Sequence, residues 1–311
     1  MHNPSVVKQK AVYEKVCEFK TTGYLYSPRE DPSGLLHIIS STGEVFQFND
    51  TTSEQIMSLN GQPSGICFDS NGYVYVADLQ ACAIFFKAPS QNETNSIIEH
   101  IISKEYDNKP FKGPTSIAFN KEDNVIYFAD SGVFENSTLA PFDCCLYSID
   151  LDTRVLRLVL NNLSFVSDVC YDSVNECIYV AETFMNRVIR LKQNEDGVFN
   201  ASVFYQFSGR VGPSALAIDE NGCVFIARYE YSNSEVDIDT EADGLISVVT
   251  KNGVYIGELS LPKLPEITGL YISPKKRENL YVTVKNSTGV FKVKISAFTA
   301  EIDKVEDALK L

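Results

Sequence analysis

A five-residue pattern of hydroxyl, small and apolar residues recurs along the chain. Each copy begins with Ser or Thr, continues with a small or polar residue and ends in three mostly apolar residues. The six copies begin at Thr22, Ser64, Thr115, Ser167, Ser214 and Thr268, at intervals of 42 to 54 residues. Further runs of β-branched and aromatic residues follow each copy, separated by turn signals such as Asn71-Gly72. This periodicity predicts an all-β fold, a six-bladed β-propeller of four-stranded antiparallel blades.

The six units fill most of the chain, so we expect residues 1–311 to form one domain. The predicted blades cover residues 20–60, 61–104, 111–161, 163–208, 210–260 and 264–296. The first strand of blade 1 is expected at residues 23–26, and the fourth strand of blade 2 at residues 97–102.

The sixth unit contains only three strand-like runs, whereas a separate run at residues 11–19 precedes the first unit. Because an incomplete last blade would expose a sheet edge, we expect residues 11–19 to become its outer strand and close the ring. The tail, residues 298–311, has Ile302, Val305 and Leu309 in a composition that favours helix. It predicts one short helix on the outside.

Composition and charge narrow the functional classes. Hydrophobic residues make up 44% of the chain, enough for a large core. The formal net charge of −14 disfavours nucleic acid and anionic membrane surfaces, which require basic patches. It is compatible with cationic ligands, although it also serves solubility. No apolar run approaches the roughly 18 residues of a membrane-spanning helix.

The cysteines and the N-terminus favour a reducing compartment. None of the eight cysteines is in C-x-x-C spacing, which disfavours a zinc site, and residues 1–10 lack the apolar segment of a signal peptide. We therefore predict a cytoplasmic protein. Six N-x-Ser/Thr sequons leave a secretory route open, and they begin at Asn49, Asn92, Asn136, Asn162, Asn200 and Asn286.

Parts of the chain resemble known propeller families. Residues 63–78, with Pro63-Ser64-Gly65 followed by a strand and Tyr-Val-Ala-Asp, resemble an NHL repeat, and residues 113–130 and 212–227 repeat the pattern. Residues 125–131 and 179–183, with the long loop before Leu146, are similar to strictosidine synthase-like proteins. Blade 1, with Tyr26-Ser27-Pro28-Arg29-Glu30, is similar to the gluconolactonase (senescence marker protein) family. These resemblances imply a six-bladed propeller that binds its ligand at one mouth of the central channel.

The recurring hydroxyl residues stand where the innermost strands begin, so we expect them to surround that mouth. The predicted binding residues are Thr22, Ser64, Thr115, Ser167, Asp168, Ser214, Arg228 and Thr268. The gluconolactonase resemblance implies divalent-metal ligands (Glu, Asn, Asn and Asp) at four of these positions, which here hold Thr22, Ser64, Ser167 and Ser214. Hard cations prefer carboxylate and carbonyl oxygens over neutral hydroxyls. We therefore predict no metal and no other cofactor.

Asp168 and Glu182 are the candidate catalytic acids or bases. Asp168 adjoins the ring hydroxyl Ser167, and Glu182 ends the second strand of blade 4. A carboxyl group in a dry channel mouth can acquire a pKa suited to proton transfer. The alternative for Glu182 is structural, because Asp78 and Asp130 occupy the same repeat position, where acidic side chains cap turn backbone groups. Arg228 takes that position in blade 5, where it could form an ion pair or bind an anionic ligand.

Two long connections are further candidates, residues 130–144 and 228–244. The first carries an apolar and aromatic insert at residues 133–142, which suggests a lid or a docking loop for a partner. The second is acidic, with Glu230, Glu235, Asp237, Asp239, Glu241 and Asp243. It invites a calcium interpretation, but it lacks the glycine at the sixth position of an EF-hand loop. A solvated loop is the alternative.

Two functional hypotheses follow from this sequence. The first is an NHL-like propeller that binds a small molecule or a protein partner at the channel mouth, without a catalytic metal. The alternative is a gluconolactonase-like or strictosidine synthase-like hydrolase or lyase that acts in the channel. The sequence does not identify the ligand.

Overall fold

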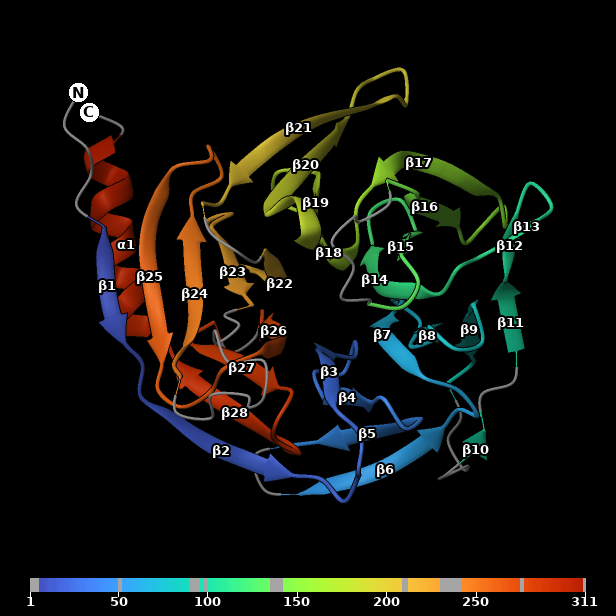
Figure 1. Ribbon diagram of the computed structural model, residues 1–311, viewed down its shortest axis with the longest axis horizontal. Coiled ribbons are helices and arrows are strands. Elements are labelled where there is room, and N and C mark those ends of the chain that lie inside the picture. The colour runs from blue at the N-terminus through green and yellow to red at the C-terminus, as the bar shows by residue number, and fades with distance from the viewer. Residues whose placement is uncertain are drawn as a thin grey trace.

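A computed structural model describes residues 6–49, 52–89, 96–97, 100–134, 142–208, 212–229, 242–274 and 277–309. Within these residues, six antiparallel sheets are arranged around a central axis, as Figure 1 shows. The predicted six-bladed propeller of four-stranded blades is therefore confirmed. In five blades the strand that contains the recurring pattern is innermost, and in blade 1 the innermost strand begins within the pattern, at Leu25. The six inner strands surround one shared channel.

Blades 1 to 3 come from the first half of the chain. From the channel outward, blade 1 consists of β3 (Leu25–Glu30), β4 (Leu36–Ser40), β5 (Glu44–Phe48) and β6 (Ser53–Ser58). Blade 2 consists of β7 (Pro63–Phe68), β8 (Val74–Asp78), β9 (Ala83–Lys87) and β11 (His100–Ser103). Blade 3 consists of β14 (Pro114–Asn120), β15 (Val125–Asp130), β16 (Cys144–Asp150) and β17 (Leu156–Leu163). A small hairpin, β12 (Glu105–Tyr106) with β13 (Lys109–Pro110), precedes blade 3.

Blades 4 to 6 complete the ring. Blade 4 consists of β18 (Val166–Asp172), β19 (Cys177–Glu182), β20 (Arg187–Gln193) and β21 (Phe199–Gln206), with a 3-10 turn η1 (Thr183–Met185) after β19. Blade 5 consists of β22 (Pro213–Ile218), β23 (Val224–Arg228), β24 (Gly244–Val249) and β25 (Tyr255–Leu261). Blade 6 consists of β26 (Ile267–Ile272), β27 (Asn279–Val284), β28 (Gly289–Lys294) and β2 (Tyr13–Glu18).

The second strands of the blades form the centre of the core. Strands β8, β19 and β27 are buried at every position, which fits their runs of Val, Ile, Tyr and Ala. A strand covered on both faces loses the alternation of polar and apolar residues. Each blade packs its apolar faces on its neighbours, so side chains of two adjacent blades share one hydrophobic cluster.

The N-terminal segment closes the ring, as the sequence predicted. Strand β2 pairs antiparallel with β28, with Tyr13 opposite Val293, and becomes the outer strand of blade 6. The Tyr13 hydroxyl also donates a hydrogen bond of 2.6 Å to the Pro262 carbonyl. A strand that the sequence did not predict, β1 (Val7–Lys10), pairs in parallel with β25 of blade 5. The segment therefore joins two neighbouring blades.

The predicted C-terminal helix is confirmed as α1 (Ser296–Leu309), which lies beside β1 and β25 in Figure 1. Phe298 and Ile302 of the helix are almost fully buried. A Cβ atom on Gly257 of β25 would lie 2.7 Å from both side chains, so the close helix–sheet contact requires glycine there. This helix, the only one described apart from η1, is too short and polar to span a membrane.

Two strand predictions were wrong. The inner strand of blade 1 is Leu25–Glu30 and not residues 23–26. The predicted fourth strand of blade 2 at residues 97–102 is divided. Its second part belongs to β11, whereas β10 (Ser96–Ile97) pairs with β6 of blade 1. Register within a blade cannot be read from the apolar run alone, because two adjacent blade edges compete for the same segment.

Candidate functional site

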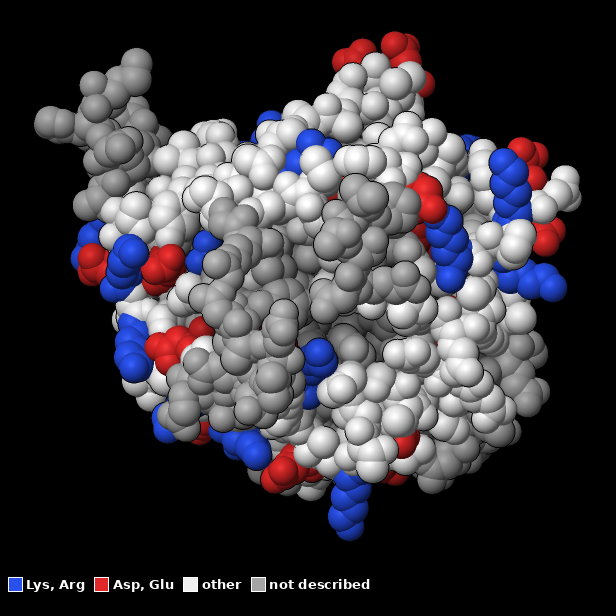
Figure 2. Space-filling view, in the orientation of Figure 1, with Lys and Arg blue, Asp and Glu red and all other residues white. Residues whose placement is uncertain are grey.

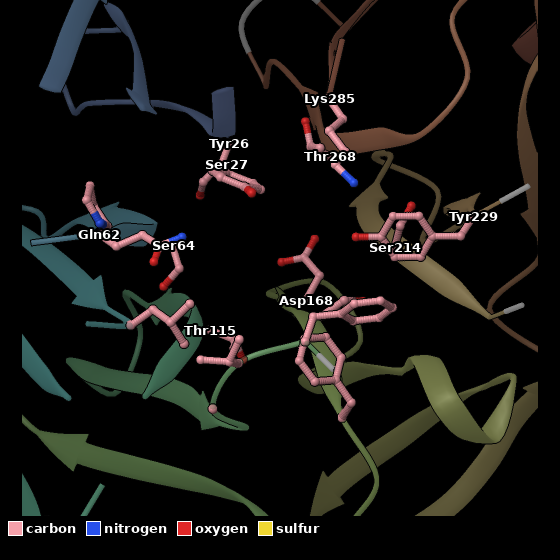
Figure 3. A pocket seen from close by; sticks show the side chains of 18 of the residues that line it. Tyr26, Ser27, Gln62, Ser64, Thr115, Asp168, Ser214, Tyr229, Thr268 and Lys285 are labelled. Carbon is pink, nitrogen blue, oxygen red and sulfur yellow. The ribbon is translucent and has the colours of Figure 1, made fainter. Parts of the chain in front are cut away.

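One mouth of the channel contains a cavity of about 300 Å³ to which all six blades contribute. It lies at the first residues of the inner strands. The face drawn in Figure 2 is hollowed near its centre, with a basic side chain beside the hollow. Figure 3 shows the polar side chains that point into this cavity, among them Ser64, Thr115, Asp168, Ser214 and Thr268. The sequence predicted these residues for the channel mouth, and the structure brings them together there.

The ring hydroxyls connect each blade to the next. In four blades the hydroxyl donates a hydrogen bond to the carbonyl oxygen just before the equivalent residue of the following blade. The bonds run from Ser64 to Pro114 (2.6 Å), from Thr115 to Val166 (2.8 Å), from Ser167 to Pro213 (3.0 Å) and from Thr268 to Leu25 (2.7 Å). Each proton is therefore used within the protein, and these oxygens retain only acceptor capacity.

Ser214 departs from that scheme. Its side-chain oxygen is buried, yet it has no hydrogen-bond partner among the described residues. Because an unpaired buried hydroxyl costs free energy, such a group usually has a function or a missing partner. Ser214 lines the cavity, so among the ring hydroxyls its proton is the one that no described residue uses.

The hydrogen-bond ring also corrects the register of blade 1. The Thr268 hydroxyl bonds to the Leu25 carbonyl, so Leu25 is the equivalent of Pro114, Val166 and Pro213. Tyr26 therefore holds the ring position of blade 1, and it lines the cavity. Thr22 lies before the strand, is exposed and is not part of the cavity wall. The tyrosine was missed because the pattern required a small hydroxyl residue.

Asp168 is the only carboxylate among the described residues that line the cavity. Its Oδ1 accepts hydrogen bonds from the Ser116 hydroxyl (2.7 Å) and from its neighbour's backbone amide, that of Val169 (2.9 Å). Its Oδ2 accepts one bond, from the Leu216 amide (2.8 Å). A carboxylate offers about four lone-pair sites. One site on Oδ2 is thus unused by the described residues, and Figure 3 shows the carboxylate directed into the cavity.

Burial raises the pKa of Asp168 above its usual range, although the Arg29 guanidinium and the three hydrogen bonds each lower it. Arg29 Nη2 lies 3.8 Å from Asp168 Oδ1. Arg29 Nη1 donates to the carbonyl oxygens of Pro28 (2.8 Å) and Leu270 (3.1 Å), which fixes the guanidinium. A carboxylate with a raised pKa is a stronger base than an exposed one.

One part of the cavity wall is mainly apolar and aromatic. The ring of Phe134 lies 4.9 Å from Phe165 and 5.9 Å from Tyr229, and all three line the cavity. Phe134 belongs to the insert at residues 133–142 that the sequence singled out, although residues 135–141 lie outside the described residues. Lys285, which the sequence did not suggest, points into the cavity (Figure 3). Lys285 and Tyr229 each directly follow a second strand, a position that could have revealed them.

Comparison with known proteins identifies the family. Residues 121–286, more than half of the chain, match the SMP-30/Gluconolactonase/LRE-like region family. The chain belongs to this family. It is 25% identical over 230 residues to the lactonase drp35 of Staphylococcus epidermidis, a match that covers 71% of this chain and 64% of that lactonase. The chain thus matches less than two thirds of the length of that relative.

Solved structures share the fold of this SMP-30/gluconolactonase-like chain. A gluconolactonase from Xanthomonas campestris superposes with a TM-score of 0.68 at 13% identity, over 89% of this chain and 87% of the other. A calcium-binding protein, regucalcin, from Agrobacterium tumefaciens superposes with a TM-score of 0.71 at 13% identity, over 92% and 95% of the two chains. At such identities the likeness establishes the fold alone.

The structure places Glu182 and Arg228 outside the cavity wall. Glu182 is fully buried and accepts hydrogen bonds from the Ser164 amide (2.8 Å) and from Arg187 Nε (2.6 Å). Asp130 accepts the Lys112 and Gly113 amides in the same way. These acids hold the segment that leads into the inner strand of their own blade. Arg228 lies over the ring of Phe207, with 5.6 Å between guanidinium carbon and ring centroid.

The donors around this cavity do not fit a hard divalent cation. Such ions take six to eight oxygen ligands, several of them carboxylates. Among the described residues of the cavity wall, the only carboxylate is that of Asp168. It already accepts three hydrogen bonds and has Arg29 beside it. The described residues contain no group of three His, Cys, Asp or Glu side chains placed to hold a metal. In the acidic loop, Asp243 bonds to Ser260, whereas Glu230, Glu235, Asp237, Asp239 and Glu241 lie outside the described residues.

Proposed function

We propose that this protein is a hydrolase of small lactones or esters that acts in the mouth cavity, with Asp168 as the general base and without a divalent metal. The lactonase drp35 and the gluconolactonase among the similar proteins support hydrolysis over binding alone. The observation that carries the proposal is Asp168 itself, a buried carboxylate directed into the cavity, with one lone-pair site that no described residue uses. This favours the hydrolase over the NHL-like binding protein, which the sequence alone had favoured.

The residues suggest how the reaction proceeds. Asp168 accepts a proton from a water molecule while the water oxygen bonds to the carbonyl carbon of the substrate. The carbonyl oxygen becomes negatively charged, and donors in the cavity stabilise it. When the bond between the carbonyl carbon and the ester oxygen breaks, the departing oxygen takes the proton back from Asp168. The product is a hydroxy acid, or an acid and an alcohol.

Two side chains can donate to the developing negative charge. The Ser214 hydroxyl has no partner among the described residues. The Lys285 ammonium lies 3.7 Å from a carboxylate oxygen of Glu266, beyond hydrogen-bond distance, and points into the cavity. The aromatic wall of Phe134, Phe165 and Tyr229 excludes water and so strengthens these interactions.

The test is a panel of γ-lactones, δ-lactones and aryl esters, assayed in the presence of EDTA with the wild type and Asp168→Asn. Asparagine keeps the size of the side chain but cannot accept the proton. We expect turnover by the wild type and a loss of about 10²- to 10⁴-fold in the variant. Thermal unfolding of both proteins shows whether the variant is folded. Full activity of folded Asp168→Asn, or no turnover of any substrate by folded wild type, would refute the proposal.

The second candidate is binding without catalysis, and one observation favours it. Asp168 bonds to Ser116 of blade 3 and Leu216 of blade 5, so it also joins three neighbouring blades. A carboxylate with that role does not need to react. In this case small molecules of the same panel would raise the melting temperature without being hydrolysed. Asp168→Asn would lower the stability of the protein, and neither protein would turn over a substrate.

A further inference from the structure

Arg29 stands between two cavities of the channel. The mouth cavity described above lies on one side. A second cavity of about 450 Å³ lies at the opposite end, among the last residues of the inner strands. Arg29 is the only described residue that lines both. The Arg29 side chain therefore lies between the two cavities, beside Asp168.

The guanidinium is held from several directions. Nη1 donates to the carbonyl oxygens of Pro28 and Leu270, on two different blades. The guanidinium carbon lies 5.8 Å from the centre of the Tyr271 ring, a cation–π contact. With these contacts made, Nη2 is left 3.8 Å from Asp168 Oδ1. The fork of an arginine can satisfy all of these directions at once, whereas a lysine cannot.

Solvent screens this ion pair only weakly. The side chains of Arg29 and Asp168 are 15% and 12% exposed. A carboxylate buried without a compensating charge is neutralised by protonation, and it then cannot act as a base. Because an arginine side chain stays protonated in proteins, the positive charge beside Asp168 is permanent.

We propose that Arg29 is the fixed cation of this channel, which keeps Asp168 ionised and aimed into the mouth cavity in place of a divalent metal ion. The inference rests on the hydrolase function proposed above. The family resemblance implies metal ligands at positions that here hold hydroxyl residues, and Arg29 would supply the positive charge that the metal would otherwise provide. Arg29 is a positioning residue, since it acts through Asp168.

The catalytic test compares the wild type with Arg29→Gln, Arg29→Lys and the control Arg187→Gln. Arg187 also pairs with a buried carboxylate, Glu182, but outside the cavity wall. We expect Arg29→Gln to lower kcat about 10²-fold with little change in KM, because a misplaced catalytic group costs that much. Arg29→Lys restores part of kcat because it keeps the charge. Arg187→Gln lowers the melting temperature and leaves kcat unchanged.

A second measurement does not depend on turnover. Calcium chloride alone is added to the wild type and to Asp168→Asn during thermal unfolding, with EDTA as the reference. A cation bound to the native state would raise the melting temperature. We expect no calcium-dependent shift in either protein.

Two outcomes would overturn the inference. One is wild-type kcat in folded Arg29→Gln. The other is a calcium-dependent stabilisation of the wild type that Asp168→Asn abolishes, since this would place a metal at the carboxylate. If the wild type hydrolyses no substrate, the proposed function fails and takes the catalytic role of Arg29 with it. The calcium measurement then still decides whether a cation binds at Asp168, the carboxylate beside Arg29.

Discussion

Replacement of Glu182 separates a structural carboxylate from a catalytic one. Glu182 has no exposed surface and accepts hydrogen bonds from the Ser164 amide and from Arg187 Nε. Glu182→Ala removes both acceptors, so a buried amide and a guanidinium lose their partner. Removal of one member of a buried ion pair costs about 3–5 kcal/mol. Because the Arg187 side chain is 25% exposed and can reach water, we expect the lower end, about 3 kcal/mol.

That free energy predicts a measurable change in melting temperature. An entropy of unfolding of about 2.1 cal/mol/K per residue gives roughly 0.65 kcal/mol/K for 311 residues. A loss of 3 kcal/mol therefore lowers the melting temperature by about 5 °C. Urea unfolding should show a lower midpoint with an unchanged slope, because the surface exposed on unfolding stays the same.

Glu182→Gln is the matched variant. Glutamine keeps one acceptor oxygen for the Ser164 amide, so its melting temperature should fall between those of the wild type and Glu182→Ala. Turnover per folded molecule should be unchanged in both variants. The structural assignment would be refuted if Glu182→Ala unfolds at the wild-type temperature. It would equally be refuted if folded Glu182→Gln loses hydrolysis.

Three further changes test the fold and the site. Because burial raises the pKa of Asp168 above its unfolded value, its contribution to stability is fully present below about pH 4 and is lost as the pH rises through the folded pKa. The melting temperature of Asp168→Asn should therefore gain on that of the wild type as the pH rises, and a constant difference would contradict this. Thr115→Val should cost about 1 kcal/mol in urea unfolding, because it removes the bond to Val166. Gly257→Ala should cost about 1–3 kcal/mol by overpacking against Phe298 and Ile302, and the added change Ile302→Val should recover part of it.

The repeat pattern predicted the fold well because each blade carries its own strand and turn signals. The closure by residues 11–19 also followed from the sequence, since only blade 6 lacked a strand. What the pattern missed were segments without such signals. Strand β1 has the sequence VKQK, with alternate residues exposed, and it pairs at an outer edge where little apolar surface is buried.

The residues that line the channel mouth were predicted in part. Five of the six ring hydroxyls lie at the cavity, together with Asp168, because their position follows from the start of each inner strand. Thr22 was wrong for blade 1, because Tyr26 takes the ring position and a pattern restricted to Ser and Thr passes over it. Arg29 could not be foreseen as the partner of Asp168. The two residues are 139 positions apart, and only closure of the ring brings them within 3.8 Å.

The position of the N-terminal strands has a consequence for synthesis of the chain. Residues 7–18 leave the ribosome before the six blades, whereas their partners β25 and β28 belong to blades 5 and 6 and emerge after blades 1 to 4. Blades 1 to 5 can form in order while residues 7–18 are still unpaired. Contacts that span more than 240 residues, such as Tyr13 to Pro262, cannot form before that. Ring closure should therefore be a late and slow step of folding, and until it occurs β25 and β28 present open edges to other molecules.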